Sequence, residues 1–239
     1  MIERVAVVPH PPLLVPELVV ADDPNVRVVR DACLAVAADL AAATPRWLGI
    51  GADPAGPADL DADAAGTFLG YGVDVVTRLS GNGATPDPAM PLPALVAGWL
   101  REQVGAAEVP VRLIRPDLPP EQCRELGARL VAELADDPVG LLILGDGSHR
   151  HGERAVGRPD PRAGGFDDAV HAALAAADPA VLLALDPDEA AALGAVGRAP
   201  WQVLAGVVGA DGRRWKSTDA RRLVPFGVAY HVAVWEPVR

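Results

Sequence analysis

The composition and charge of the chain are those of an acidic globular protein. It has 239 residues, of which 50% are hydrophobic and 22% charged, so it can bury a substantial core. The formal net charge of −11, without a large cluster of Lys and Arg, speaks against a nucleic-acid partner, because such proteins displace counterions from phosphates with a basic surface. We interpret the short basic run 213–216 as an exposed strand end.

The cysteines and the N-terminal segment predict a cytoplasmic protein. Only Cys33 and Cys123 occur, each on an apolar stripe, so we expect both in the core and see no disulfide framework that would indicate secretion. Prolines between residues 9 and 16 break the apolar helix that a signal peptide needs. No apolar run has the length of a membrane span, so no membrane partner is expected.

Strand and helix signals alternate along the first half of the chain. The β-branched run 4–8 ends at Pro9 and predicts a buried strand. An apolar stripe from Val26 to Leu40 then predicts a helix over 25–43. The elements expected next are a strand at 47–51, a surface loop at 55–65, a strand at 73–77, a helix at 92–104 and a strand at 109–114.

The second half continues the alternation around one very apolar strand. A helix is expected over 121–134, with its charged residues off the apolar stripe. Residues 139–144 show no polar alternation, as in strands that are buried on both faces of a sheet. A polar loop at 145–165 is expected to precede helices at 166–177, 187–195 and 200–208 and a strand pair near 213–218 and 226–234.

This alternation predicts an α/β fold. We expect residues 1–239 to form a single three-layer α/β/α domain with a mostly parallel mixed central sheet. There is no internal repeat and no linker long enough to divide the chain.

Three reactive side chains come just after predicted strands. His10 follows strand 4–8, Asp53 follows strand 47–51, and His149 follows strand 139–144. If the strands are parallel, the loops open onto the same rim of the sheet, where α/β proteins bind ligands. Structural roles remain open for each, because a loop histidine is usually solvated and an aspartate before proline commonly bonds its own backbone. Walker, G-x-G-x-x-G and G-x-S-x-G motifs are absent at the places where they would indicate nucleotide binding or a serine hydrolase.

Several segments resemble one enzyme family. Residues 8–14, Val-Pro-His-Pro-Pro-Leu-Leu, are similar to the opening motif of the catalytic subunit of protocatechuate 4,5-dioxygenase and other class III extradiol ring-cleavage dioxygenases. Residues 145–150, Gly-Asp-Gly-Ser-His-Arg, resemble the G-D-x-S-H-R segment of that family, whose superfamily includes the Memo-like proteins. Weaker similarities cover 66–72, 165–167 and 197–201.

The resemblance implies a site for non-haem iron, catechol and oxygen. Enzymes of the family hold Fe(II) with two histidines and a carboxylate, and a further histidine acts as acid and base. His10 matches the first ligand histidine and His149 matches the acid–base histidine. Asp53 stands where the second histidine is expected, and Val196, which cannot bind metal, stands at the third ligand position. Glu189 is the nearest upstream carboxylate.

Three functional hypotheses follow from this incomplete ligand set. In the first, His10 and Asp53 bind Fe(II) with a third group such as His149, and the protein oxidises a small catechol-type aromatic molecule. In the second, the same residues act on a small molecule without metal. In the third, a non-catalytic relative uses the cleft for a ligand or partner. Phe68, Tyr71 and Trp201 are the candidates for stacking on an aromatic ring. Because relatives often associate, the resemblance also allows a homo-oligomer.

Overall fold

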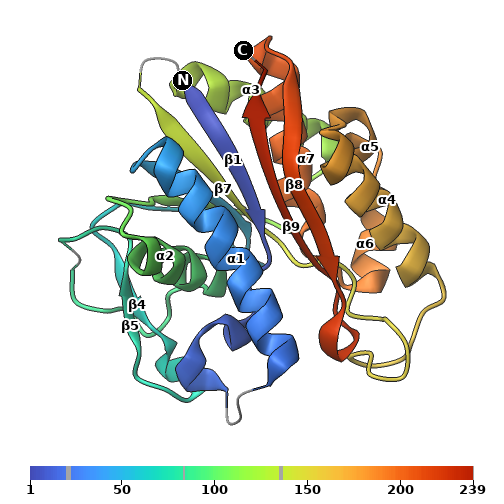
Figure 1. Cartoon of the computed structure of the whole chain (residues 1–239), viewed down its shortest axis with the longest axis horizontal. Helices are drawn as coiled ribbons and strands as arrows, with labels where there is room; N and C mark the ends of the chain where they lie inside the picture. Colours follow the sequence, from blue (N-terminus) through green and yellow to red (C-terminus); the bar gives the residue numbers. More distant parts are fainter. Residues whose placement is uncertain (20–22, 83, 135–136, 239) are drawn as a thin grey trace.

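A mixed β-sheet forms the centre of the protein (Figure 1). The structure is a computed structural model that describes residues 1–19, 23–82, 84–134 and 137–238. Within those residues the main sheet has seven strands in the order β3-β6-β2-β7-β1-β9-β8, and a second sheet pairs β4 with β5. The strands are β1 (Ile2–Val8), β2 (Trp47–Ala52), β3 (Ala58–Leu60), β4 (Ala65–Thr67), β5 (Val76–Arg78), β6 (Val111–Ile114), β7 (Val139–Leu144), β8 (Trp215–Leu223) and β9 (Tyr230–Pro237).

The middle of the main sheet is parallel and its edges are antiparallel. β7 pairs in parallel with β1 on one side and with β2 on the other, and β2 pairs in parallel with β6. Val8 lies opposite Leu144, and Ile50 lies opposite Ile143, so the three strands end at nearly the same level. β3, β9 and β8 add antiparallel edges. The predicted α/β fold with a mostly parallel mixed sheet is therefore confirmed.

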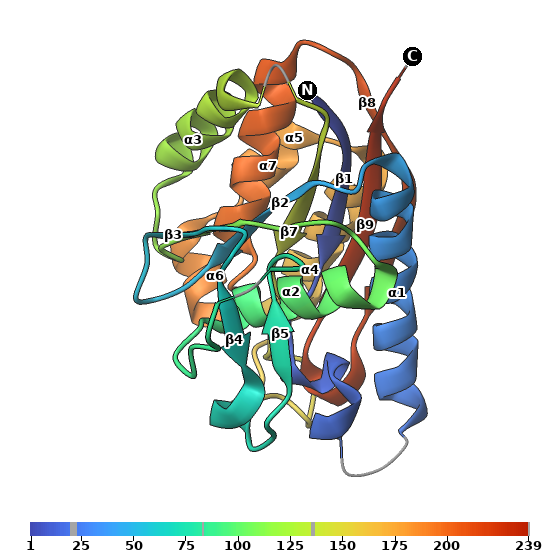
Figure 2. The same ribbon diagram turned by 90° about the vertical axis from the view of Figure 1, so that its left-hand side faces the viewer.

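Helices cover both faces of the sheet, as Figure 2 shows from the side. One face packs against α1 and α2, and the other packs against the group from α3 to α7. Side chains alternate across a strand, so Leu141 and Ile143 of β7 enter one core while Leu142 and Leu144 enter the other. This double burial explains the unbroken apolar run. The helices are α1 (Pro24–Ala43), α2 (Leu92–Val104), α3 (Pro120–Glu133), α4 (Arg162–Ala176), α5 (Pro179–Leu183), α6 (Pro187–Leu193) and α7 (Arg198–Asp211).

The expected elements differ from the structure where strands are short. Residues 55–65, expected as a surface loop, contain β3, which pairs with β6 at the sheet edge. The strand expected at 73–77 begins at Val76 and pairs with β4, which the sequence did not reveal. The five-residue α5 was also missed. Three-residue strands and a single helical turn carry too few residues for a periodic pattern, so pairing partners decide them.

Both cysteines are in the core, as expected. Cys33 in α1 and Cys123 in α3 are fully buried and not bonded to each other. Burial raises the pKa of both thiols, and that of Cys123 to about 11, so both remain protonated and unreactive at neutral pH. None of the helices in the described part of the chain is long and apolar enough to cross a bilayer.

Helices α3 and α7 touch each other through glycines. A Cβ atom on Gly127 of α3 would lie 2.3 Å from the carbonyl oxygen of Val203, and one on Gly206 of α7 would lie 2.4 Å from that of Arg124. Both contacts are with backbone, which cannot rotate away as a side chain can. The absence of a side chain at these positions therefore sets the distance between the two helices.

We predict opposite effects of alanine at two glycines of this helix pair. Gly127→Ala forces the backbones apart and should lower the free energy of unfolding by about 2–3 kcal/mol. Gly209→Ala in α7, where a Cβ meets nothing within 4 Å, should raise it by about 0.5–1 kcal/mol because alanine favours the helix. Urea unfolding followed by circular dichroism measures both. Equal stabilities would contradict the close helix contact.

Candidate functional site

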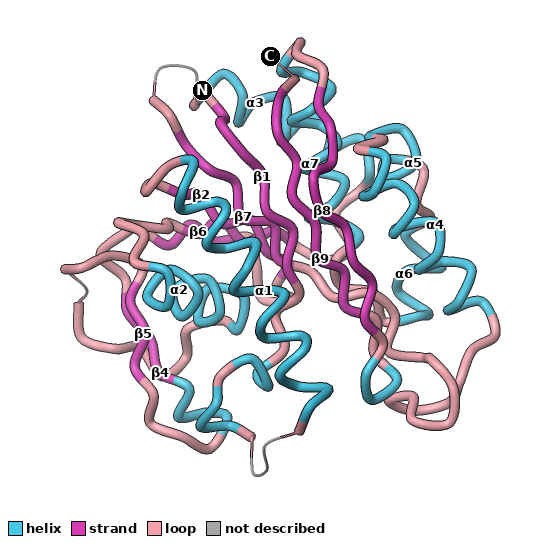
Figure 3. Tube along the Cα trace, in the orientation of Figure 1, coloured by secondary structure: helices cyan, strands magenta, loops and turns pink. Residues whose placement is uncertain are grey.

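The three sequence-predicted residues follow strands that end at one edge of the sheet. β7 lies between β1 and β2, and all three are parallel. His10 comes two residues after β1, Asp53 directly after β2, and His149 in the loop after β7. Loops gather at this edge, which is the lower end of the strands in Figure 3. The rim that the sequence predicted is therefore present in the fold, and we use "rim" for these three residues and their contacts.

His10 is held at the rim by a hydrogen bond from its backbone. Its N–H donates a hydrogen bond to Asp146 Oδ1 at 2.9 Å. The backbone carbonyl of Asp146 accepts from Gly197 N at 2.9 Å, so this aspartate joins the ends of β1 and β7 to the start of α7. The side chain of His10 is buried, and its Nδ1 has no hydrogen-bond partner among the described residues. A buried nitrogen without a partner is costly, so it is a candidate contact for a ligand.

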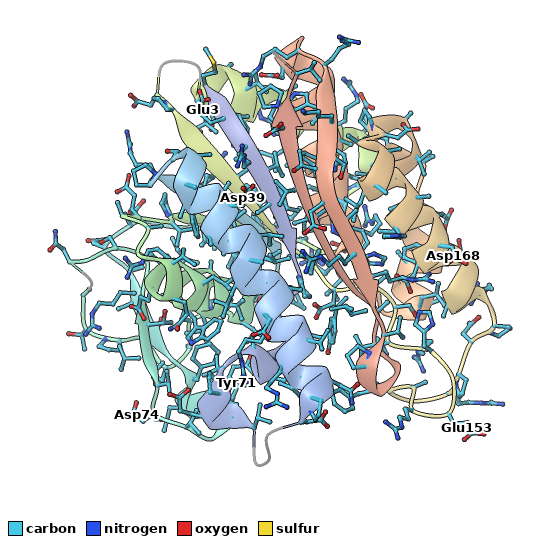
Figure 4. All side chains as sticks on the ribbon, in the orientation of Figure 1. Glu3, Asp39, Tyr71, Asp74, Glu153 and Asp168 are labelled. Atoms are coloured by element: carbon cyan, nitrogen blue, oxygen red, sulfur yellow. The ribbon has the colours of Figure 1, made fainter. Side chains whose placement is uncertain are left out.

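Asp53 has a structural role and also faces an aromatic residue. Its Oδ1 accepts from Ala55 N at 2.7 Å, the local turn that aspartate commonly makes. Partial burial raises the pKa of Tyr71, and the negative charge of Asp53 raises it further. Tyr71 belongs to the short 3₁₀-helix Phe68–Tyr71 on the side of β4 and β5 (Figure 4). The structural reading of Asp53 is thus correct, and its other carboxylate oxygen accepts no hydrogen bond from the residues that the structure describes.

Of the three aromatic residues expected at the site, only Tyr71 is exposed. Phe68 and Trp201 are fully buried, whereas 44% of Tyr71 is accessible. Phe68 packs against the Tyr71 ring in a tilted arrangement, with 6.1 Å between the ring centroids. Trp201 instead packs edge-on against His231 in the core, 5.5 Å between centroids. The expectation that Phe68 and Trp201 stack on a ligand is therefore wrong, because both rings are used in packing.

The ring of His149 is fixed in one orientation. Its Nδ1 lies 2.9 Å from the carbonyl oxygen of Val156. A carbonyl only accepts hydrogen bonds, so Nδ1 carries the hydrogen, and in the neutral ring Nε2 is then a bare acceptor. Nε2 lies against Gly194, where a Cβ atom would be 1.7 Å away. Gly194 also has φ +68°, so two independent constraints require glycine beside this histidine.

The donors at the rim do not fit the ligand set that the resemblance implies. No group of three or more His, Cys, Asp and Glu side chains in the described ranges is arranged to hold a metal ion. Val196, at the expected third ligand position, is apolar and 38% exposed. Glu189 is instead close enough to Arg162 of α4 that its charge adds to the raised pKa of that guanidinium, which comes mainly from the hydrogen bonds that Arg162 donates to Asp160. Metal binding by His10 and Asp53 stays a prediction, and these two donors alone fall short of the three that such a site requires.

A cavity of about 330 Å³ opens beside the 194–197 segment. Val196 and Arg198 line it, together with Asp117 from the loop after β6. The guanidinium of Arg198 donates to the carbonyl oxygens of Pro116 and Leu118, and burial lowers its pKa. Arg198 therefore connects the start of α7 to the loop after β6 and forms part of the cavity wall.

A buried carboxylate anchors the loop that carries His149. Asp167 of α4 is fully buried and accepts hydrogen bonds from His151 Nε2 at 2.6 Å and from His231 Nε2 at 2.8 Å. It also accepts from the backbone N of Ser148 at 3.3 Å. Sequence analysis did not assign these residues a role. The available signal was His231, a single histidine inside the apolar run of β9, which indicates a buried polar partner.

Comparisons with known proteins support the fold alone. No protein-family model matches the chain, and no curated protein matches it. Among solved structures, the uncharacterized protein JW3007 from Escherichia coli K12 is similar, with a TM-score of 0.54 and 14% sequence identity. The match covers 98% of this chain and 99% of that chain. At this identity the likeness concerns the architecture and does not transfer an activity.

Two adjacent aspartates are expected to differ sharply in their importance. Asp167→Asn replaces an acceptor by an N–H₂ group that faces donors, and should lower the free energy of unfolding by about 2–3 kcal/mol. Asp168→Asn, the matched control, removes only a surface ion pair with Arg222 and should change it by less than about 1 kcal/mol. Figure 4 shows Asp168 at the surface of α4. Chemical denaturation measures both, and equal losses would show that the buried network has no special role.

Proposed function

We propose that the protein is a metal-independent relative of the class III extradiol dioxygenase subunits. It binds a small aromatic molecule at the rim, and His149 acts there as the acid–base residue. The fixed tautomer of His149 is the observation that carries this proposal, because it presents Nε2 as a base without help from a metal. The resemblance of residues 8–14 and 145–150 to the family supports the location of the site.

The other rim residues suit a small phenolic molecule. The exposed ring of Tyr71 offers a stacking surface, and its raised pKa keeps the hydroxyl protonated as a donor. The unpartnered Nδ1 of His10 and the second carboxylate oxygen of Asp53 offer polar contacts. His149 Nε2 takes a proton from an acidic O–H or C–H of the bound molecule and returns it to another atom. Such an isomerisation balances without an oxidant.

Iron-dependent ring cleavage is the second candidate. The observation that favours it is the buried Nδ1 of His10, because a histidine nitrogen without a hydrogen-bond partner is also a preferred metal ligand. When bound, Fe(II) would supply electron transfer between a catechol and oxygen. His10 and Asp53 are the two residues that would hold it. The first candidate is preferred because the residues that the structure describes contain no group of three such donors arranged to hold a metal ion.

Metal analysis separates the two candidates. The protein is purified anaerobically, incubated with Fe(II), desalted and compared with His10→Ala and Asp53→Ala. We expect no stoichiometric iron in any of the three, since two protein donors give a weak site. Near-stoichiometric iron in the wild type that disappears in both variants would overturn the metal-free proposal and establish the iron site.

Activity on phenols and catechols tests the role of His149. We expect proton exchange or isomerisation of a bound phenol to fall by at least about 100-fold in His149→Ala, as for loss of a general base. Binding and the unfolding free energy should change little, because the ring is only half-buried. His171→Ala in α4 is the control and should retain the activity. Equal loss of stability and activity in His149→Ala would instead assign this histidine a structural role.

A further inference from the structure

A groove runs between the start of α1 and the turn that joins β8 to β9. It consists of cavities of about 350 Å³ and 230 Å³ that share Asn25, Val224 and Pro225. In Figure 1 the two walls lie at the lower end of the molecule, where α1 begins and the red β8–β9 turn ends. None of the rim residues lines either cavity. We call this feature the α1–β8 groove.

One end of the groove is polar and contains His151. Its side chain is 17% exposed and lines the larger cavity. Its Nε2 lies 2.6 Å from Asp167 Oδ2, and the second oxygen of Asp167 is occupied by His231. Asp167 and His231 are both fully buried, so the hydrogen bond from Nε2 holds the His151 ring in a fixed position.

The hydrogen bond to Asp167 determines which nitrogen of His151 can accept a hydrogen bond from a ligand. A carboxylate accepts hydrogen bonds, so Nε2 of His151 carries the hydrogen. In the neutral ring Nδ1 is then a bare acceptor, and it has no hydrogen-bond partner among the residues that the structure describes. A ligand that contacts this nitrogen must therefore bring an O–H or N–H donor.

The charges at the polar end favour a monoanion. Arg154 and Glu153 both line the larger cavity, and both are exposed. Figure 4 shows Glu153 on the outer side of the loop, directed toward solvent. The guanidinium of Arg154 forms no ion pair with any residue that the structure describes, so it is available to a carboxylate. The nearby carboxylate of Glu153 disfavours a doubly charged group such as phosphate.

The other end of the groove is apolar. Val28 and Val29 of α1 form one wall, and Leu223, Val224 and Pro225 form the other. Val28 is 53% exposed and Val224 is 41% exposed, so apolar surface is left uncovered on both walls. An apolar chain laid between them would remove this surface from water.

The turn that forms the far wall is held in an unfavourable backbone conformation. Phe226 has φ +56°, which a non-glycine residue rarely adopts. The next residue, Gly227, approaches the backbone of Arg154 so closely that a Cβ atom would lie 2.4 Å from its carbonyl oxygen. The turn and the loop of Arg154 are thus fixed together, and the polar end of the groove keeps its shape without a ligand. Strained backbone of this kind concentrates at ligand sites.

We propose that the α1–β8 groove binds an apolar hydroxy acid. Its hydroxyl donates to His151 Nδ1, its carboxylate pairs with Arg154, and its apolar chain lies between Val28 and Val224. The groove is a second small-molecule site, separate from the rim, and it does not depend on the reaction proposed there.

Calorimetric titration with 2-hydroxyoctanoate tests the proposal. Three analogues each lack one feature: octanoate lacks the hydroxyl, 1,2-octanediol lacks the carboxylate, and lactate lacks the chain. We expect each analogue to bind at least about tenfold more weakly, which is the usual effect of losing one charge-assisted hydrogen bond or an apolar chain. Equal affinity for 2-hydroxyoctanoate and octanoate, or no binding at millimolar concentration, would overturn it.

Variants locate the binding. Arg154→Gln and Val28→Asp should each weaken binding of 2-hydroxyoctanoate about tenfold. Arg158→Gln, in the same loop but outside both cavities, should leave it unchanged, as should His149→Ala at the rim. In ¹⁵N-labelled protein, His151 Nδ1 should show the shift of an unprotonated nitrogen and move when 2-hydroxyoctanoate, but not octanoate, is added. Unchanged affinity in Arg154→Gln and Val28→Asp would contradict the assignment.

Discussion

The parallel pairing of β7 with β1 and β2 is the constraint on which the rest of the structure depends. Because β7 is buried on both faces, it requires helices on each side of the sheet, and the long chain segments between strands supply them. Parallel pairing also directs the carboxyl ends of the three strands to one edge. The same arrangement that fills the core therefore brings His10, Asp53 and the loop of His149 into one region of the molecule.

Two aspartates then fix the loops at that edge. Asp146 connects the end of β1 to the end of β7 and the start of α7. Asp167 receives hydrogen bonds from the loop after β7 and from β9, across the fold. Asp167 is fully buried, and a buried carboxylate is costly unless its oxygens are paired, so its hydrogen bonds favour a single loop arrangement. Asp146 is only partly buried and adds one side-chain and one backbone contact.

The loop after β7 carries two histidines whose rings have different hydrogen-bond partners. On the rim side, the tautomer of His149 is set by a backbone carbonyl, and Nε2 is the acceptor. On the groove side, the tautomer of His151 is set by a carboxylate, and Nδ1 is the acceptor. His149 and His151 are only two residues apart, yet each presents a different ring nitrogen as the hydrogen-bond acceptor. We propose acid–base chemistry at the rim and binding of an amphipathic molecule in the α1–β8 groove.

The sequence by itself determined the alternation of elements, the buried central strand and the three residues at the rim. These features depend on periodicity and on strand ends, which are local. It did not determine β3, β4 and α5, which are too short to carry a pattern and form through their partners. Only the tertiary structure showed that Trp201 is a core residue, that Asp53 closes its own turn, and that His151, Asp167 and His231 meet. These contacts join residues up to 64 positions apart, and no local signal specifies which buried polar groups will pair when the chain folds.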